Sequence, residues 1–182
     1  GGYVAAIRAS QLGKKVVVIE SSNLGGICLN WGCIPTKALL RSSEVYDYFK
    51  ESKAFGLDVE KITFDLRKII SRSRKVANQL SVGIEYLFKK NSVETLFGTA
   101  KIDKDKNINV TLLANKEEIT VVTKKILIAT GAKPKSLPFI KSFSDNIWSY
   151  FQALSPNSIP KSIGIIGSGA IGIEFASFFN SM

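Results

Sequence analysis

The stretch SIGIIGSGAIGIEFASFF, from Ser162 to Phe179, decides the fold class. Residues 162–166 have the apolar composition of a buried strand, and Ile173 opens a segment with helical character. Between them lies a complete G-x-G-x-x-G motif, formed by Gly167, Gly169 and Gly172. Glycines at this spacing allow a tight turn, a close approach of the backbone to a pyrophosphate group, and close packing of helix against strand. We therefore expect the opening strand and helix of a Rossmann-like unit that binds a dinucleotide.

A partial copy of the same pattern opens the chain. Gly2 stands where the last glycine of such a motif would fall, and a small-residue helix is expected over 4–12. The run KVVVI, residues 15–19, predicts a buried strand that ends at Glu20. A carboxylate about twenty residues after the glycines binds the ribose 2′-OH in dinucleotide-binding units. We expect the second half of a βαβ unit whose first strand is missing, and Glu20 is either its ribose ligand or an ordinary strand-end residue.

The residues between these two units predict helices and strands around an inserted β-meander. A loop over 21–32 precedes a helix from Cys33 to Phe49, and a longer helix is expected over 64–90. The basic residues of the longer helix are interpreted as a solvated face, namely Arg67, Lys68, Arg72, Arg74 and Lys75. Strands are expected over residues 93–97, 107–113, 118–124 and 125–129. The stretch 133–160 holds four of the five prolines and is interpreted as a connection.

Composition excludes several classes of protein. The chain is 45% hydrophobic and can bury a core, but no apolar run approaches the length of a membrane span. Two cysteines and no histidine exclude a disulfide-rich scaffold and a structural zinc site, so we expect no bound metal. The net charge of +10 comes mainly from scattered lysines. We therefore expect a lysine-rich surface, with neither a nucleic-acid partner nor a membrane.

The segment GGICLNWGCIPTK, from Gly25 to Lys37, carries the most specific chemistry. Cys28 and Cys33 are separated by four residues, and Cys33 lies where a helix is expected to begin. A helix N-terminus has positive potential and unpaired N–H groups, which favour a thiolate over a thiol. A thiolate is the attacking species in disulfide exchange. The pattern indicates a redox-active pair, and the alternative is two unrelated buried cysteines.

This segment resembles the redox-active disulfide of the pyridine nucleotide–disulfide oxidoreductases. The form Cys-Leu-Asn-x-Gly-Cys-Ile-Pro-Thr-Lys is most similar to that of the dihydrolipoamide dehydrogenases, the flavoprotein components of the 2-oxo acid dehydrogenase complexes. Glutathione reductases more often carry Val after the first cysteine and Lys-Lys at the end. The resemblance covers all 182 residues. Because chains of this family are more than twice as long, we expect a piece from the N-terminal region.

The resemblance implies FAD and NAD as cofactors. It places Gly2 and Glu20 at the FAD nucleotide, and it makes the complete G-x-G-x-x-G the NAD site. It also places Lys37 near the flavin N5, paired with Glu174. The cofactor-binding residues expected in this way are Gly2, Glu20, Gly25, Gly26, Lys37, Gly98, Ala100, Thr130, Gly131, Gly167, Gly169, Gly172 and Glu174.

The resemblance further implies a reaction. Dihydrolipoamide, carried on the lipoyl domain of an acyltransferase, would reduce a Cys28–Cys33 disulfide, and the electrons would reach NAD+ through FAD. Cys28 would form the mixed disulfide with the substrate, and Cys33 would be the flavin-side thiolate. The family's base is a histidine of the other subunit in a homodimer, from a region expected after Met182. The compartment expected is the cytoplasm, or the mitochondrial matrix in a eukaryote.

Three alternatives stay open from the sequence. The chain could belong to an enzyme like glutathione or mercuric reductase, or it could be a catalytically inactive fragment. A nucleic-acid binder would rest on the net charge alone. The expected fold is a glutathione-reductase-like, three-layer α/β fold. Residues 1–141 would form an FAD-binding domain with its first strand and first glycines missing, and residues 142–182 would begin an NAD-binding domain.

Overall fold

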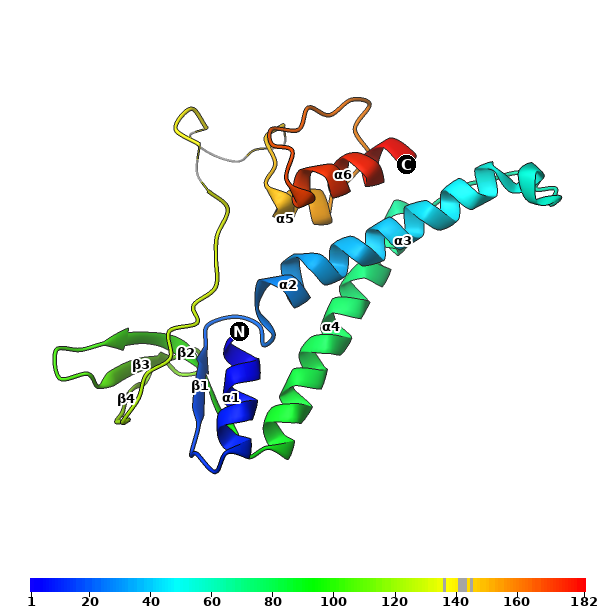
Figure 1. Ribbon diagram of the computed structural model, residues 1–182. Helices are drawn as coiled ribbons and strands as arrows, with labels where there is room; N and C mark the ends of the chain where they lie inside the picture. The colour runs from blue at the N-terminus through cyan, green and yellow to red at the C-terminus, as the bar shows by residue number, and fades with distance from the viewer. Residues whose placement is uncertain (136, 141–143, 145) are drawn as a thin grey trace. The chain divides into compact units, whose positions relative to one another are not determined.

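A computed structural model describes residues 1–135, 137–140, 144 and 146–182. Two compact units are present (Figure 1). Unit 1 consists of Gly1–Gly26 and Gln79–Ala132, and unit 2 consists of Ile27–Asn78 and Lys133–Met182. The expected domain boundary between residues 141 and 142 lies outside the described residues.

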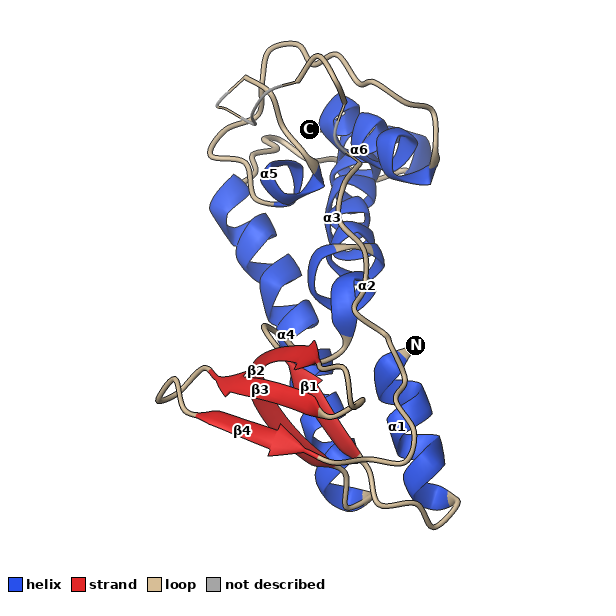
Figure 2. Cartoon of the chain, turned by 90° about the vertical axis from the view of Figure 1, so that its left-hand side faces the viewer, coloured by secondary structure: helices blue, strands red, loops and turns tan. Residues whose placement is uncertain are grey.

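Unit 1 is built on a four-stranded sheet in the order β1-β2-β3-β4 (Figure 2). β1 (Val17–Glu20) runs parallel to the first part of β2 (Glu94–Ile102). The second part of β2 pairs antiparallel with β3 (Ile108–Leu112), which pairs antiparallel with β4 (Glu118–Val121). The expected meander is therefore confirmed. β2 joins it to β1 because a single long strand changes partner along its length.

Helices cover this sheet within unit 1. α1 (Gly2–Gln11) lies beside β1, as both ribbon views show (Figures 1 and 2). α4 (Leu66–Lys90) begins in unit 2 and ends in unit 1. The Ser10 hydroxyl at the end of α1 donates to the carbonyl of Asn91, directly after α4. Long-range hydrogen bonds of this kind tie the ends of the two helices together.

Unit 2 is helical and has its own core. Its elements are α2 (Gly26–Trp31), α3 (Cys33–Lys50), a 3-10 helix η1 (Ser52–Phe55), α5 (Tyr150–Leu154), α6 (Ala170–Ser181) and the first part of α4. The core consists of Leu39, Ala153, Leu154, Phe175, Phe178 and Phe179. The phenylalanines lie three and four residues apart on α6, so one face of this helix is buried. The core thereby holds α6 and α5 against α3.

Two segments expected to be strands are not paired as strands. Residues 125–129 and 162–166 have strand composition, but neither is hydrogen-bonded to a neighbouring strand in the described part of the chain. Leu127, Ile128 and Ile166 are exposed. A strand requires the backbone groups of a neighbour, which composition alone cannot supply, so these two predictions were wrong.

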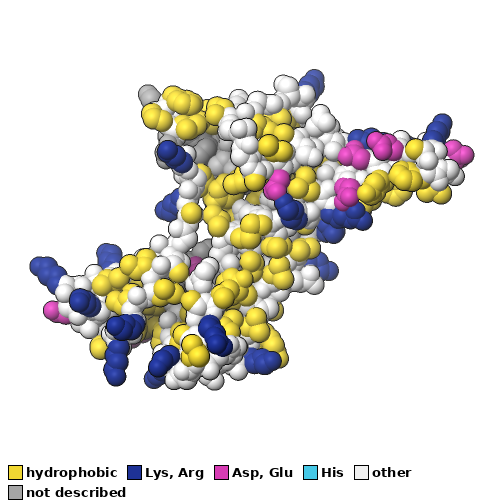
Figure 3. Space-filling view, viewed as in Figure 1, with side chains coloured by type: hydrophobic (Ala, Val, Ile, Leu, Met, Phe, Trp, Pro, Cys, Tyr) yellow, Lys and Arg dark blue, Asp and Glu magenta, His cyan; other side chains and the backbone are white. Residues whose placement is uncertain are grey.

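The prediction of a loop over residues 21–32 was also wrong in part. Residues 26–31 instead form the short helix α2. In the described residues, none of the helices is both long and apolar enough to cross a bilayer. On the face shown in Figure 3, Lys and Arg side chains lie at separate places among other side chains.

Candidate functional site

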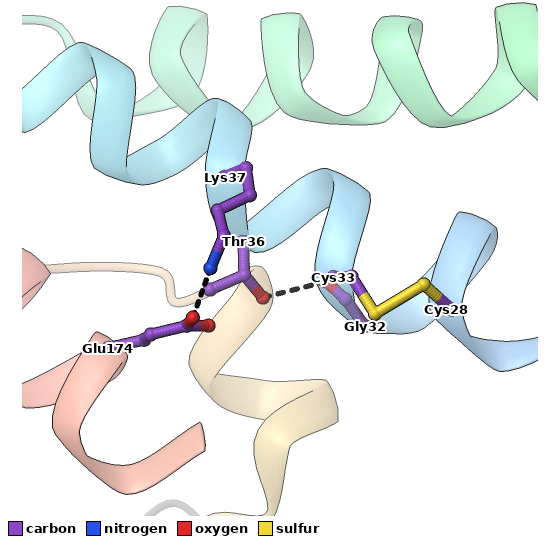
Figure 4. Close-up of a disulfide and its surroundings, with 6 residues drawn as sticks. All are labelled: Cys28, Gly32, Cys33, Thr36, Lys37 and Glu174. Atoms are coloured by element: carbon purple, nitrogen blue, oxygen red, sulfur yellow. Dashed lines mark hydrogen bonds and ion pairs between the residues drawn. A yellow bond between two sulfur atoms is a disulfide. The ribbon is translucent and has the colours of Figure 1, made fainter. Parts of the chain in front are cut away.

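The two cysteines lie on consecutive helices of unit 2. Cys28 is on α2 and half-buried, and Cys33 is the first residue of α3 and exposed. They form a disulfide, with their Cα atoms 4.8 Å apart (Figure 4). The pairing implied by the family resemblance is therefore present in the structure.

Gly32 allows this disulfide loop to close. A Cβ atom at this position would lie 3.0 Å from the Ile27 carbonyl oxygen and 3.1 Å from the Cys28 Cα atom. Both neighbours are backbone atoms and cannot rotate away, so a side chain would push α2 and α3 apart. The Gly32 carbonyl accepts a hydrogen bond from the Thr36 hydroxyl at 2.8 Å (Figure 4). We did not select Gly32 from the sequence, although its place between the two cysteines and before a helix was a usable signal.

The N-terminus of α3 acts electrostatically on Cys33. The helix has 18 residues, its N-cap is Gly32, and no side chain caps its first turn. The partial positive charge of the helix end therefore falls on the first residue, which is Cys33. This potential lowers the cost of a thiolate at Cys33 once the disulfide is opened.

Three consecutive residues of α4 donate hydrogen bonds to the backbone around the disulfide. Arg74 Nη1 donates to the Asn30 carbonyl at 2.7 Å, and the fully buried Ser73 hydroxyl donates to the Pro35 carbonyl at 3.0 Å. Arg72 Nη1 donates to the Ala38 carbonyl at 2.9 Å. These donors come from more than 30 residues further along the chain, and they fasten α2 and the start of α3 to α4.

The interpretation of these basic residues as a solvated face was wrong for Arg74. Its side chain is half-buried, and burial lowers the pKa of its guanidinium. The guanidinium lies 4.5 Å from the centroid of the Trp31 ring, which is also 5.0 Å from the centroid of Phe151. Exposure is correct for the remaining members of the set, Arg67, Lys68, Arg72 and Lys75.

Lys37 and Glu174 join α3 to α6. Lys37 Nζ and Glu174 Oε1 form an ion pair, as the resemblance implied (Figure 4). The Lys37 side chain is 61% exposed, so solvent screens the pair and its contribution to stability is small. Lys37 lies one turn after Cys33 on α3. The ion pair therefore restricts the movement of the Lys37 ammonium close to the disulfide.

The glycines of the second motif have different structural functions. Gly167 has φ +110°, a conformation that L side chains rarely adopt. A Cβ atom at Gly172 would clash with the Gly167 carbonyl oxygen and lie 3.2 Å from Ile165 Cγ2. Gly169 is the N-cap of α6, and open space surrounds the place of its absent side chain. The first turn of α6 is therefore accessible to a ligand, which fits a pyrophosphate group.

The residues expected at an FAD nucleotide near the N-terminus belong to unit 1. A Cβ atom at Gly2 would lie 3.2 Å from Ala129 Cβ, so this glycine allows α1 to approach residue 129. The Glu20 carboxylate accepts a hydrogen bond from the Ser22 N–H at 2.8 Å. Gly25 and Gly26 have φ +99° and +72°. Glu20 thus has a structural partner in the turn, and its side chain remains partly accessible at the end of β1.

The later residues expected at FAD lie on β2 and after the meander. Gly98 is at the point where β2 changes from β1 to β3, and Ala100 follows it as an exposed residue. Thr130 and Gly131 are exposed, and Gly131 has φ +78°. Unit 1 thus holds one part of the expected set and unit 2 holds the rest, and their cofactor roles stay predictions.

Among the described residues, no group of three or more His, Cys, Asp and Glu side chains could hold a metal.

Comparison with known proteins gives the family. The model of the family described as "Pyridine nucleotide-disulphide oxidoreductase" matches residues 1–182. The chain belongs to the pyridine nucleotide-disulphide oxidoreductase family. The sequence-based prediction of the family is therefore confirmed.

Relatives in this family include enzymes named dihydrolipoyl dehydrogenase. The one from Rhizobium etli is 49% identical over 196 residues, which cover 100% of this chain and 41% of the relative. The one from Zymomonas mobilis is 51% identical over 179 residues, which cover 98% of this chain and 38% of the relative. The chain thus spans about 40% of the length of these two relatives.

Solved structures of similar fold cover nearly the whole chain. The crystal structure of LpdA from Mycobacterium tuberculosis superposes with a TM-score of 0.90 at 23% identity, over 99% of this chain and 40% of that one. The flavoprotein disulfide reductase RclA from Escherichia coli superposes with a TM-score of 0.76 at 25% identity, over 99% and 37%. The expected α/β fold of the family is confirmed.

Proposed function

We propose that this chain belongs to a dihydrolipoyl dehydrogenase, which oxidises dihydrolipoamide to lipoamide with NAD+ through FAD and a redox-active Cys28–Cys33 disulfide. The observation that carries the proposal is the disulfide itself, with its second cysteine at the N-terminus of α3. The high identity to enzymes of that name along the whole chain supports this substrate over others of the family.

The residues present fit the two cofactors. For NAD, open space at Gly169, the positive φ of Gly167 and the close approach at Gly172 favour a pyrophosphate against the first turn of α6. For FAD, the resemblance assigns Gly2 and Glu20 to the nucleotide, and the Glu20 side chain stays partly accessible at the end of β1. When bound, FAD would supply a two-electron acceptor for the reduced cysteines and a hydride donor to NAD+.

The cysteines carry the exchange chemistry in two steps. A thiolate of dihydrolipoamide attacks Cys28 Sγ, the Cys28–Cys33 bond breaks, and Cys33 leaves as a thiolate stabilised by the start of α3. The second substrate thiol, after losing its proton, then attacks the substrate sulfur of the mixed disulfide. Lipoamide leaves, and Cys28 departs as the second thiolate. One disulfide is thus reduced while one dithiol is oxidised, and two protons are released from the substrate.

The ion pair of Lys37 and Glu174 supports this arrangement. Glu174 on α6 holds the Lys37 ammonium at α3, one turn after Cys33. If a flavin binds on this side of the cysteines, the Lys37 ammonium would be placed to compensate negative charge on it. We assign Lys37 and Glu174 to the flavin-side positioning that the family resemblance implies.

The same proposal includes the partners of the whole enzyme. The substrate would be presented by the lipoyl domain of an acyltransferase, and the enzyme would act as a homodimer whose second subunit supplies the base. The expected compartment is the cytoplasm, or the mitochondrial matrix in a eukaryote. Neither a nucleic acid nor a membrane is part of the proposed function.

The test is a comparison of substrates on the whole protein that contains this chain. We expect turnover of dihydrolipoamide with NAD+, and little turnover of glutathione disulfide with NADPH. Preference for the second pair would refute the proposal and favour a glutathione-reductase-like enzyme. The variants Cys28→Ser and Cys33→Ser should each abolish dihydrolipoamide oxidation, whereas Ser42→Ala on the same helix α3 should retain it.

The chain of 182 residues is tested separately. We expect no turnover of dihydrolipoamide, because the resemblance places the base outside these residues. We also expect weak retention of FAD, because the resemblance places further FAD-contacting segments outside them. Measurable dihydrolipoamide:NAD+ activity or a stoichiometric yellow chromophore after purification would contradict this expectation.

A further inference from the structure

The helix that carries Cys28 is too short to be stable by itself. α2 has six residues, less than two full turns, and a helix of this length does not persist in water without tertiary contacts. While the disulfide is intact, the bond to Cys33 restrains α2. Once the bond is reduced, other contacts must keep the Cys28 sulfur near the Cys33 sulfur.

Arg74 supplies such a contact at the C-terminal end of α2. Its Nη1 donates to the carbonyl of Asn30, one of the last carbonyls of the helix, at 2.7 Å. A cation at this end donates to a carbonyl of the last turn and opposes the negative end of the helix dipole. The guanidinium also covers the ring of Trp31, the last residue of α2, with 4.5 Å between its Cζ atom and the ring centroid.

The contact is directed at the turn between the two cysteines. Asn30 and Trp31 lie between Cys28 and Cys33, and Gly32 is the only residue that separates Trp31 from the second cysteine. Trp31 also contacts Phe151 of α5, and the centroids of the two rings are 5.0 Å apart. Holding Asn30 and Trp31 therefore restrains two of the four residues that separate the two cysteines.

Burying the Arg74 guanidinium lowers the stability of the fold. Its Nε and Nη2 atoms are buried and have no hydrogen-bond partner among the described residues. An unsatisfied buried donor reduces stability, and so does the desolvation of a charge. A large apolar side chain would fill this place at lower cost, so a purpose specific to arginine is needed.

We propose that Arg74 is a positioning residue of the disulfide, which holds the Asn30–Trp31 turn so that the two sulfurs stay within reach in the dithiol state. This inference rests on the proposed redox cycling of Cys28 and Cys33. Without Arg74 the reduced segment gains conformational freedom, which must be lost again each time the disulfide forms. The equilibrium between dithiol and disulfide then shifts toward the dithiol.

The test is a redox titration of the 182-residue chain in glutathione buffers, with free thiols trapped by a maleimide of high mass. The chain has two cysteines, so the added mass counts the reduced molecules directly. For Arg74→Met we expect a shift toward the dithiol of about tenfold in the equilibrium constant, equal to about 30 mV for this two-electron couple. A tenfold shift is about the free-energy cost of ordering the backbone of one residue.

Arg72→Met is the matched control. Arg72 lies two residues away on α4 and makes the same kind of bond to the Ala38 carbonyl, which is outside the cysteine loop. We expect this variant to stay within twofold of the wild-type equilibrium. A loss of stability shared by both variants thus cannot produce the expected difference.

Two outcomes for Arg74→Met would overturn the proposal. One is an equilibrium within twofold of the wild type, and the other is a shift toward the disulfide, which would mean that Arg74 acts as a charge that stabilises thiolates. If circular dichroism shows that Arg74→Met is unfolded, Arg74→Lys decides, because lysine keeps the charge and loses the planar contact with Trp31. A shift below twofold in Arg74→Lys then overturns the proposal.

Failure of the proposed function would look different. If the wild-type cysteines form no disulfide in any of the buffers, redox cycling and the role of Arg74 are both refuted. If the wild type cycles normally and Arg74→Met behaves as Arg72→Met, the role of Arg74 alone is refuted.

Discussion

Substitution of Gly98 by alanine separates the packing function of this residue from the cofactor contact implied by the family. Gly98 lies on β2 opposite Leu112 of β3, at the first residue of the antiparallel pairing. A Cβ atom there would lie 2.7 Å from the Thr111 carbonyl oxygen and 2.7 Å from Val110 Cγ1. Gly98 is not in the left-handed region of φ, so the effect of alanine is steric.

Neither neighbour can move without cost. The Thr111 oxygen belongs to the backbone of a strand that is paired on both sides, and Val110 is fully buried. Relief of contacts this short requires β2 and β3 to separate, and overpacking of this kind costs about 1–3 kcal/mol. Alanine also lowers the conformational entropy of the unfolded chain, which offsets about 0.4–1 kcal/mol of this loss. We expect Gly98→Ala to lower the free energy of unfolding by about 1–2 kcal/mol.

The measurement is urea unfolding of the 182-residue chain without cofactors, followed by circular dichroism. Gly83→Ala is the matched control, because Gly83 lies within α4 and nothing stands within 4 Å of its absent Cβ. This second variant should raise the free energy of unfolding by about 0.5–1 kcal/mol, since alanine is the better helix residue. The two glycine-to-alanine changes should thus have opposite signs.

The reasoning is refuted if Gly98→Ala is as stable as the wild type or more stable. In that case the close approach of β2 and β3 does not require glycine, and contact with a cofactor would be the remaining reason for it. A destabilised Gly83→Ala would contradict the assignment of open space beside α4.

Three further substitutions test the core, a helix cap and an ion pair. Leu39→Ala removes a fully buried side chain from the core of unit 2 and should lower the free energy of unfolding by about 2–5 kcal/mol in urea. Ser149→Ala removes the N-cap of α5, where the Ser149 hydroxyl accepts from the Phe151 N–H and Gln152 completes a capping box, and should lower the thermal midpoint through a loss of about 1 kcal/mol. The hydrogen bond from Lys50 lowers the pKa of the Asp47 carboxyl below its ordinary value, so the unfolded state binds a proton more readily as the pH falls. The wild type should therefore lose stability below about pH 4, the ordinary range of an Asp carboxyl, more steeply than Asp47→Asn, and parallel pH profiles in urea would contradict this.

The chemistry of the site was readable from the sequence because it depends on short stretches of chain. The two cysteines and the start of α3 lie within one short stretch of chain, and the glycines of the second motif lie within another, directly before and in the first turn of α6. Their geometry follows from local rules for helix ends and for glycine at positive φ. The disulfide pairing and the Lys37–Glu174 ion pair needed more than local rules, and the family resemblance supplied them.

The outcome for the strands shows where local patterns stop. The meander was predictable because its strands follow one another and pair with their neighbours in sequence. Residues 125–129 and 162–166 have equally apolar composition, yet they have no paired strand among the described residues. Composition describes the side chains of a strand, whereas a sheet also requires a second backbone at the correct distance.

By itself, the sequence determined the α/β class, the cysteine pair at the start of a helix and the glycine turn before α6, because each follows from residue types at a short, regular spacing. Only the tertiary structure decided the role of α4, whose Arg72, Ser73 and Arg74 donate to carbonyls around the disulfide from a distant part of the chain. It also decided that Gly98 is a packing residue between two strands. Both depend on backbone atoms that folding brings close, and no periodicity in the sequence marks a backbone acceptor.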